Sequence, residues 1–337
     1  MTGPTLLAPS AGEPSPFEGV LGIGDVIAGK YVVEKVLGAG GMGIVVGARH
    51  MKLDEQVAIK CLLPSVANDK ESVERFMREA RASVKIKNEH VVRVMDVGLL
   101  DTGSPYMLME HLEGNDLGHH LREEGRLPIA DAVDYVLQAC EAIAEAHALG
   151  IVHRDLKPSN LFLMRRSDGT PCIKVLDFGI SKALSVTETP QDPGLTDTQS
   201  VFGSPTYMSP EQVRSAKRVD HRTDIWALGV ILHELITGTS PFVGESVPGL
   251  LASIVADPPT RARSTRAEVP EGLELVIMGC LEKDVNRRTQ TIADLARALF
   301  PYTDSGSASS VQRIERLSIP RAPGSRPSVH SVRPPTG

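Results

Sequence analysis

Acidic, basic and amide side chains suited to act on a phosphate gather in one short stretch of this sequence. The run 153–160 contains Asp155, Lys157 and Asn160, and Asp177 follows seventeen residues later, at the end of a short apolar run. Carboxylate and amide oxygens are suitable ligands for Mg²⁺, which prefers oxygen and keeps part of its coordination sphere for water and phosphates. A single loop acid is usually a solvated charge, but so many polar groups at these spacings predict a site for Mg²⁺ and a phosphate.

A glycine-rich run is the second candidate for contact with a phosphate. Gly38-Ala39-Gly40-Gly41-Met42-Gly43 offers a backbone that can approach a phosphate chain closely and present N–H donors. Taken alone, the run fits a plain hairpin turn equally well. A dinucleotide-binding fingerprint would need a helix after the glycines. Ile44-Val45-Val46 instead continues as a strand, which disfavours that reading.

A lysine and a glutamate form the third candidate. Lys60 ends the apolar run Val57-Ala58-Ile59, and Glu79 lies in the helical pattern that follows. A lysine at a strand end often only extends to solvent. Held by a helix carboxylate, its ammonium group would instead sit at a fixed point over the α- and β-phosphates of a nucleotide.

The elements that must position these groups fall into two lobes. Short β-branched runs and one amphipathic helix, at 71–87, predict a small antiparallel sheet with a helix over residues 30–110. Apolar residues at helical spacing then predict helices at 129–149, 223–237, 247–256, 273–281 and 292–299. We expect a flexible leader over 1–29. We also expect a disordered, basic tail rich in Ser, Pro and Arg over 303–337, because it has no aromatic residue.

Composition excludes several classes of protein. The 337 residues carry a net charge of −6 and only 4% aromatic residues, which argues against a nucleic-acid partner. The four cysteines form no CxxC pair, so neither a zinc site nor a disulfide framework is predicted. No standard signal peptide and no run long enough for a membrane span occur. We therefore expect a cytoplasmic protein.

Taken together, these motifs resemble those of the protein kinases, in particular the eukaryotic-like Ser/Thr class of bacteria. The resemblance covers about residues 31–300, in the family's order: Gly38 to Val45, Val57 to Lys60, His153 to Asn160, Asp177-Phe178-Gly179, Ser209-Pro210-Glu211, Asp224 to Gly229, and Arg288 as the partner of Glu211. It implies an α+β fold with two lobes: a small antiparallel β-sheet lobe with one main helix over 30–112, and a larger helical lobe over 113–302.

The resemblance also implies roles for single residues. Asp155 would accept the proton of the substrate hydroxyl, Lys157 would neutralise the transferring phosphoryl group, and Asn160 and Asp177 would hold Mg²⁺. Backbone groups of Glu110 and Leu112 would meet the adenine of ATP. The implied ATP contacts are Leu37, Gly38, Ala39, Gly40, Gly41, Met42, Gly43, Val45, Ala58, Lys60, Glu79, Met109 as gatekeeper, Glu110 and Leu112.

Substrates and regulation follow from smaller clues. Lys157-Pro158-Ser159 resembles Ser/Thr kinases and implies protein substrates with Ser or Thr acceptors. Arg154 beside the catalytic acid favours activation by a phosphate in the segment 177–211. Thr198 is the expected autophosphorylation site, with Thr196 and Ser200 as second sites, unless these are ordinary polar loop residues. Self-association would permit autophosphorylation in trans.

Two other functions are compatible with parts of this pattern. A catalytically weak signalling scaffold with a kinase fold is disfavoured because Lys60, Asp155 and Asp177 are all present. A small-molecule phosphotransferase is disfavoured by the long segment between Asp177 and Glu211. Two departures from the family pattern, Ser83 and Val285, bear on the stability of the active conformation and not on the chemistry.

Overall fold

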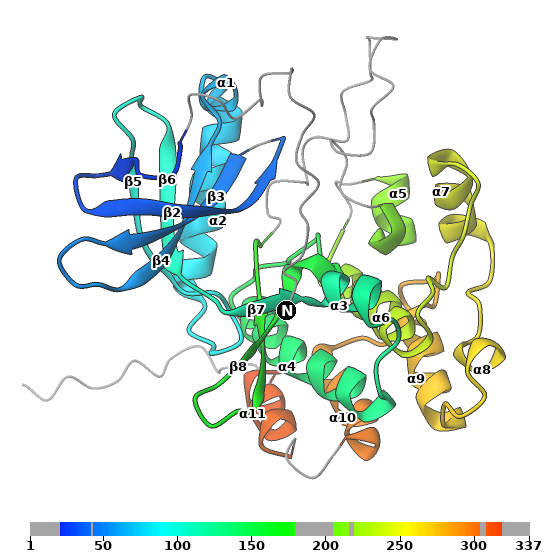
Figure 1. The fold of residues 1–337 in the computed structure, drawn as a ribbon. Helices are drawn as coiled ribbons and strands as arrows, with labels where there is room; N and C mark the ends of the chain where they lie inside the picture. Colours follow the sequence, from blue (N-terminus) through cyan, green and yellow to red (C-terminus); the bar gives the residue numbers. More distant parts are fainter. Residues whose placement is uncertain (1–20, 42, 179–204, 216–218, 304–307, 319–337) are drawn as a thin grey trace, which may run out of the picture.

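Alternating β-branched residues near the start of the chain produce an antiparallel sheet of six strands in the order β1-β2-β3-β4-β6-β5. The computed structural model describes residues 21–41, 43–178, 205–215, 219–303 and 308–318. The strands are β1 Val26–Ile27, β2 Tyr31–Gly40, β3 Gly43–His50, β4 Gln56–Leu62, β5 Val94–Leu99 and β6 Pro105–Glu110. Neighbouring strands pair antiparallel throughout, and short turns join all the paired neighbours except β4 and β6. This sheet forms the N-lobe (Figure 1).

Two helices follow β4, and the longer one packs on the sheet. After the short α1 (Pro64–Ala67), α2 (Lys70–Lys85) begins where the side chain of Asp69 accepts hydrogen bonds from the backbone N–H groups of Glu71 and Ser72. Its apolar side, including Phe76 and Ala80, packs in one cluster with Ala58, Met107 and Met109 of the sheet. The predicted helix at 71–87 is therefore present, displaced by one or two residues at its ends.

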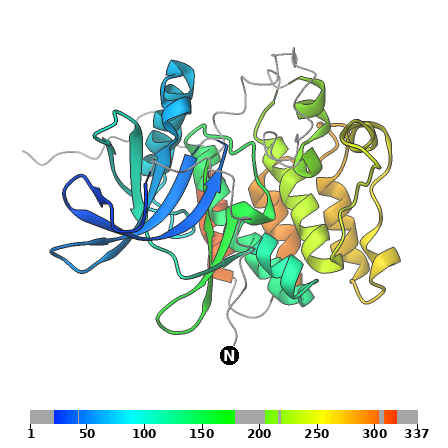
Figure 2. The same cartoon turned by 45° about the horizontal axis from the view of Figure 1, so that its top comes forward.

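The C-lobe is helical, as predicted, and is built around α4 and α6 (Figures 1 and 2). Its helices are α3 Leu117–Glu123, α4 Ile129–Ala148, α5 Pro210–Arg214, α6 Arg222–Thr237, α7 Val247–Ala256, α8 Ala262–Thr265, α9 Glu271–Cys280, α10 Ile292–Leu299 and α11 Ala308–Ser318. A small sheet of β7 (Gly114–Asp116), β8 (Leu161–Arg165) and β9 (Pro171–Val175) lies where this lobe meets the N-lobe. Trp226 of α6 is fully buried and stacks on Phe242.

The expectations for both ends of the chain were partly wrong. Within the predicted leader, β1 pairs with β2, and Ile27 is buried in the core of the sheet. Within the predicted disordered tail, residues 308–318 form α11, with Val311 and Ile314 buried in the C-lobe core. The composition averaged over each end did not reveal these two elements. A few apolar residues at suitable spacing can bury enough surface against an existing core to order a short segment.

Two further observations concern the described residues as a group. All four cysteines are buried and carry free thiols, so no disulfide supports the fold. Within the described ranges, none of the helices combines the length and the apolar character that a membrane crossing requires.

Candidate active site

A buried carboxylate of α6 holds the loop that carries the predicted catalytic residues. Asp224 is 1% exposed, and its two oxygens accept hydrogen bonds from the backbone N–H groups of His153 and Arg154, each at 2.9 Å. A ring nitrogen of His147 lies 2.7 Å from the same carboxylate. Burial opposes ionisation of Asp224, but His147 and the backbone donors outweigh it, so its pKa lies below the ordinary value. The loop can therefore keep Arg154 at a backbone φ of 66°.

This loop brings Asp155, Lys157 and Asn160 together. Lys157 Nζ lies 3.6 Å from Asp155 Oδ2. The side-chain nitrogen of Asn160 donates a 2.8 Å hydrogen bond to the backbone carbonyl of Asp155, and Asn160 is buried. With its nitrogen engaged, the amide of Asn160 has its oxygen left as the atom that can ligate a cation.

Asp177 is fixed beside Asn160 through its neighbour in the chain. The N–H of Leu176 donates to the backbone carbonyl of Asn160 at 2.9 Å, and the carbonyl of Leu176 lies 3.1 Å from His153 Nε2. Phe178 is fully buried, with its ring centroid 4.8 Å from that of His153. Asp177 itself has a φ of 44° and a side chain that is 47% exposed. The two predicted Mg²⁺ ligands therefore lie on adjacent, hydrogen-bonded segments.

Lys60 links the N-lobe to this segment. Its Nζ lies 2.7 Å from Glu79 Oε1 on α2 and 2.9 Å from Asp177 Oδ1. Burial disfavours the charged ammonium, but the carboxylates of Asp177 and Glu79 outweigh it and raise the pKa of Lys60 above its ordinary value. Lys60 is thus a fixed cation at the position expected for a nucleotide phosphate.

The glycines of the β2–β3 turn serve two different purposes. At Gly43 a Cβ atom would come within 2.3 Å of the backbone oxygen of Cys61, so packing between β3 and β4 requires a glycine there. At Gly38, Gly40 and Gly41 a Cβ would meet no atom of the described residues within 4 Å. Packing does not explain these three glycines. The open space beside them fits close approach of a phosphate chain to the backbone.

An apolar cluster lines the side of the predicted adenine position. Ala58 and Met109 are buried in it, and Val45 and Leu112 pack against it. The N–H of Glu110 donates to the carbonyl of Arg93, so of its two backbone groups only the carbonyl can be offered to a base. Leu37, at the end nearest the glycines, is 44% exposed.

A second ion pair, between Arg288 and Glu211, lies in the C-lobe near the loop of the predicted catalytic residues. Arg288, fully buried, makes two hydrogen bonds to the carboxylate of Glu211, at 2.6 and 2.9 Å. The next residue, Gln212, donates from its side chain to the carbonyl of Arg154 at 2.9 Å. The predicted pairing of Glu211 with Arg288 is therefore present, and Gln212 connects it to the loop that carries the predicted catalytic residues.

Sequence reasoning overlooked two residues of this network. His147 lies among apolar residues in the helix predicted at 129–149, where a titratable side chain is a signal of a buried partner. Gln212 carries no recognisable signal in the sequence. Several predicted site residues lie outside the described part of the chain: Met42, Gly179, Thr196, Thr198 and Ser200.

Comparison with known proteins agrees with this geometry. Residues 31–300 match the family described as the protein kinase domain. The chain is 39% identical over 265 residues to serine/threonine-protein kinase pkn3 of Myxococcus xanthus, covering 78% of this chain and 48% of that protein. It is 39% identical over 274 residues to serine/threonine-protein kinase PrkC of Bacillus subtilis, covering 81% and 40%. This chain thus spans about half or less of the length of these curated relatives.

A solved structure leads to the same family. The crystal structure of the Mycobacterium tuberculosis PknI kinase domain superposes with a TM-score of 0.63 at 26% sequence identity, covering 84% of this chain and all of that one. The predicted two-lobed α+β kinase fold is confirmed by this likeness and by the observed sheet and helices. The family match covers well over half of the chain and includes every motif of the site. The chain belongs to the protein kinase family.

Proposed function

We propose that this chain transfers the γ-phosphate of ATP to Ser and Thr hydroxyls of proteins. The observation that carries the proposal is the ion-paired group of Lys60, Glu79 and Asp177, which links α2 and the sheet to the segment bearing the site acids. The curated relatives are named serine/threonine-protein kinases, which supports Ser and Thr as acceptors.

The residues around Asp155 fit the transfer step. The carboxylate of Asp155 would accept the proton of the acceptor hydroxyl, and Lys157 would neutralise the charge that develops on the transferred group. Asn160 and Asp177 supply the oxygen ligands that Mg²⁺ prefers. When bound, this ion would neutralise the phosphates and orient them for in-line attack. Lys60 would hold the nucleotide phosphates in place.

The experiment is phosphate transfer from labelled ATP by the wild type and Asp155→Asn. We expect the substitution to lower the rate by about 100-fold or more, because it removes the group that accepts the proton. Asp101→Asn, at an exposed position in the turn after β5, is the matched control and should retain full activity. Equal label incorporation by Asp155→Asn and the wild type would contradict the proposal and favour a signalling scaffold.

We also propose that phosphorylation within 177–211 activates the enzyme. Support comes from Arg154, whose backbone is held next to Asp155 by Asp224 and Gln212. Thr198 is the proposed acceptor, with Thr196 and Ser200 as second sites, and transfer would occur between associated copies. Mass spectrometry and activity before and after phosphatase treatment test this idea. Full activity without phosphate in the segment would refute it.

We place the activity in the cytoplasm. The four free thiols suit a reducing compartment, where disulfides are rare. Fractionation of cells that produce the chain, followed by detection of phosphate transfer, tests this assignment.

A further inference from the structure

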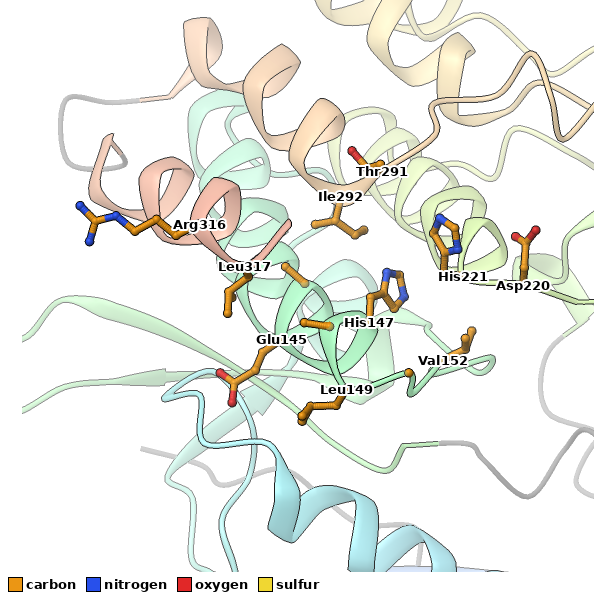
Figure 3. Close-up of a pocket in the computed structure, with 13 residues that line it drawn as sticks. Glu145, His147, Leu149, Val152, Asp220, His221, Thr291, Ile292, Arg316 and Leu317 are labelled. Atoms are coloured by element: carbon orange, nitrogen blue, oxygen red, sulfur yellow. The ribbon is translucent and has the colours of Figure 1, made fainter. Parts of the chain in front are cut away.

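The helix α11 packs on the C-lobe, beyond the part of the chain that matches the kinase family. Val311 and Ile314 are 9% and 0% exposed in the core formed with α4 and α10, and Leu317 packs beside them. Figure 3 shows α11 alongside α4, with Leu317 directed toward it. Its end also lines a pocket of about 830 Å³ that contains none of the predicted site residues.

An ion pair between a half-exposed guanidinium and a buried carboxylate joins α11 to α4. The guanidinium of Arg313 makes two hydrogen bonds to the carboxylate of Glu141, at 2.6 and 2.9 Å. Glu141 is 1% exposed, whereas the side chain of Arg313 is 47% exposed. A buried carboxylate that loses its partner is strongly unfavourable, because it has already lost its water. Arg313 therefore neutralises a charge in the middle of α4.

The segment 86–92, which directly follows α2, contacts the same part of α4. Glu141 Oε1 lies 3.8 Å from His90 Nε2, and the Asn88 side chain donates to the Glu141 carbonyl at 3.5 Å. One turn further along α4, Glu145 accepts a 2.6 Å hydrogen bond from the N–H of Lys87. Glu145 points toward the N-lobe segment in Figure 3. Charges on α4 thus fix the connection between α2 and the sheet.

The same segment is bonded to the strand that leads to Asp177. His90 Nδ1 lies 2.8 Å from the carbonyl of Ile173. The N–H of Val175 donates to the carbonyl of His90 at 2.7 Å, and the N–H of Val92 donates to the carbonyl of Val175 at 3.1 Å. Asp177 is two residues beyond this pairing. Segment 86–92 therefore connects to α2, which contains Glu79, and to β9, which leads to Asp177. Glu79 and Asp177 both form ion pairs with Lys60.

We propose that Arg313 of α11 is a positioning residue for the active site. By neutralising Glu141 it keeps segment 86–92 seated between α4 and β9, and so keeps Glu79 and Asp177 within bonding distance of Lys60. The inference rests on the proposed kinase function for its effect on turnover.

Because of the charges around His90, the proposal predicts that the activity of Arg313→Met depends on pH. Glu141 of α4, Glu89 of the same segment, Arg166 after β8 and the Cys172 thiol of β9 face the ring. In the wild type, burial keeps the pKa of His90 below its ordinary value. Once Arg313 is removed, a proton on His90 is the nearest means of balancing Glu141. Activity lost in Arg313→Met should therefore return partly at acid pH.

The experiment compares Arg313→Met, Arg313→Lys and the double variant Arg313→Met/Glu141→Gln with the wild type. The measurements are autophosphorylation kinetics, affinity for a fluorescent ATP analogue with Mg²⁺, and amide hydrogen exchange in segment 86–92. We expect Arg313→Met to weaken nucleotide affinity by about 10-fold, because an unpaired buried charge disturbs the segment. Exchange in 86–92 should rise, and the other two variants should stay within about 3-fold of the wild type. Arg316→Met, an exposed change on the same helix, is the matched control and should have no effect.

The outcomes separate this inference from the proposed function. Wild-type protein that binds the nucleotide but transfers no phosphate would refute the kinase activity, while nucleotide affinity and exchange still test Arg313. If Arg313→Met lowers only the melting temperature, and affinity, exchange and the pH profile match the wild type, α11 is a stabilising brace and the positioning role is wrong. A deficit in Arg313→Met that does not shrink between pH 8 and pH 6 also overturns it.

Discussion

The residues that would contact a ligand are held in place by charged side chains around them. Asp224 fixes the backbone of the loop that carries Asp155, and Glu79 fixes Lys60. Arg288 fixes Glu211 and, through the neighbouring Gln212, the carbonyl of Arg154. Each charge is buried with a partner and is therefore costly to remove on its own. The reactive groups gain defined positions from these pairs.

At the scale of single residues, the role of Lys60 can be tested by substitution. Lys60→Met should lower kcat/KM for ATP by about 100-fold or more, because it removes the fixed cation from the phosphate position. Lys52→Met, in the exposed turn after β3, is the matched control. Steady-state phosphate transfer at several ATP concentrations measures the effect. A change of less than about 3-fold in Lys60→Met would contradict the assigned role.

At the scale of elements, the glycines of the β2–β3 turn allow a packing role and a ligand-binding role to be tested separately. Gly43→Ala should lower the melting temperature by several degrees, because its Cβ would collide with the backbone of Cys61. Gly38→Ala should leave the melting temperature unchanged, since the added methyl group meets no atom within 4 Å in the part of the chain that the structure describes. It should still weaken ATP binding.

Thermal melts and nucleotide titrations of the two variants decide the matter. A destabilised Gly38→Ala protein, or one with wild-type affinity for ATP, would show that the open glycines have no role in binding a phosphate chain.

The sequence predicted most of these elements because their signals are local. Strand and helix periodicity located the sheet, α2 and the long helices of the C-lobe, and motif spacing located Asp155, Asn160 and Asp177. The resemblance also predicted the pairing of Arg288 with Glu211. The helix predicted at 129–149 is α4, and Gly150 follows it with a φ of 73°, a conformation that favours glycine after a helix.

The parts that could not be predicted depend on contacts between distant segments. The 2.7 Å contact of His147 with Asp224 spans 77 residues, and that of Arg313 with Glu141 spans 172. No local pattern encodes such pairs. The helix α11 was missed because its few apolar residues stand in a segment rich in Ser, Pro and Arg, and they are buried only through contact with the distant α4 and α10.

Across the whole molecule, buried histidines determine how stability responds to acid. His90, His153 and His233 are each at most 1% exposed, and burial lowers the pKa of all three. The unfolded chain binds protons near pH 6.5, whereas the folded chain binds them only at lower pH. Protons therefore favour the unfolded state as the pH falls below about 6.5.

We expect the free energy of unfolding to fall between pH 7.5 and pH 5.5. Each of the three histidines contributes at most about 1.4 kcal/mol per pH unit. Urea denaturation at several pH values measures how steeply the free energy of unfolding changes with pH. His233→Leu should reduce this slope, because it removes one titrating group that is remote from the loop carrying Asp155. A free energy that stays constant over this range, or rises toward acid pH, would contradict the assignment.

The burial of all four cysteines has a consequence for chemical labelling. Burial raises the pKa of Cys61, in β4, to about 12, and that of Cys280, in α9, to about 12. A thiolate that is both rare and covered reacts with a maleimide only when its surroundings open. Because Cys61 lies in the N-lobe and Cys280 in the C-lobe, the order in which a maleimide alkylates the two native thiols reports which lobe opens first, and no engineered cysteine is needed.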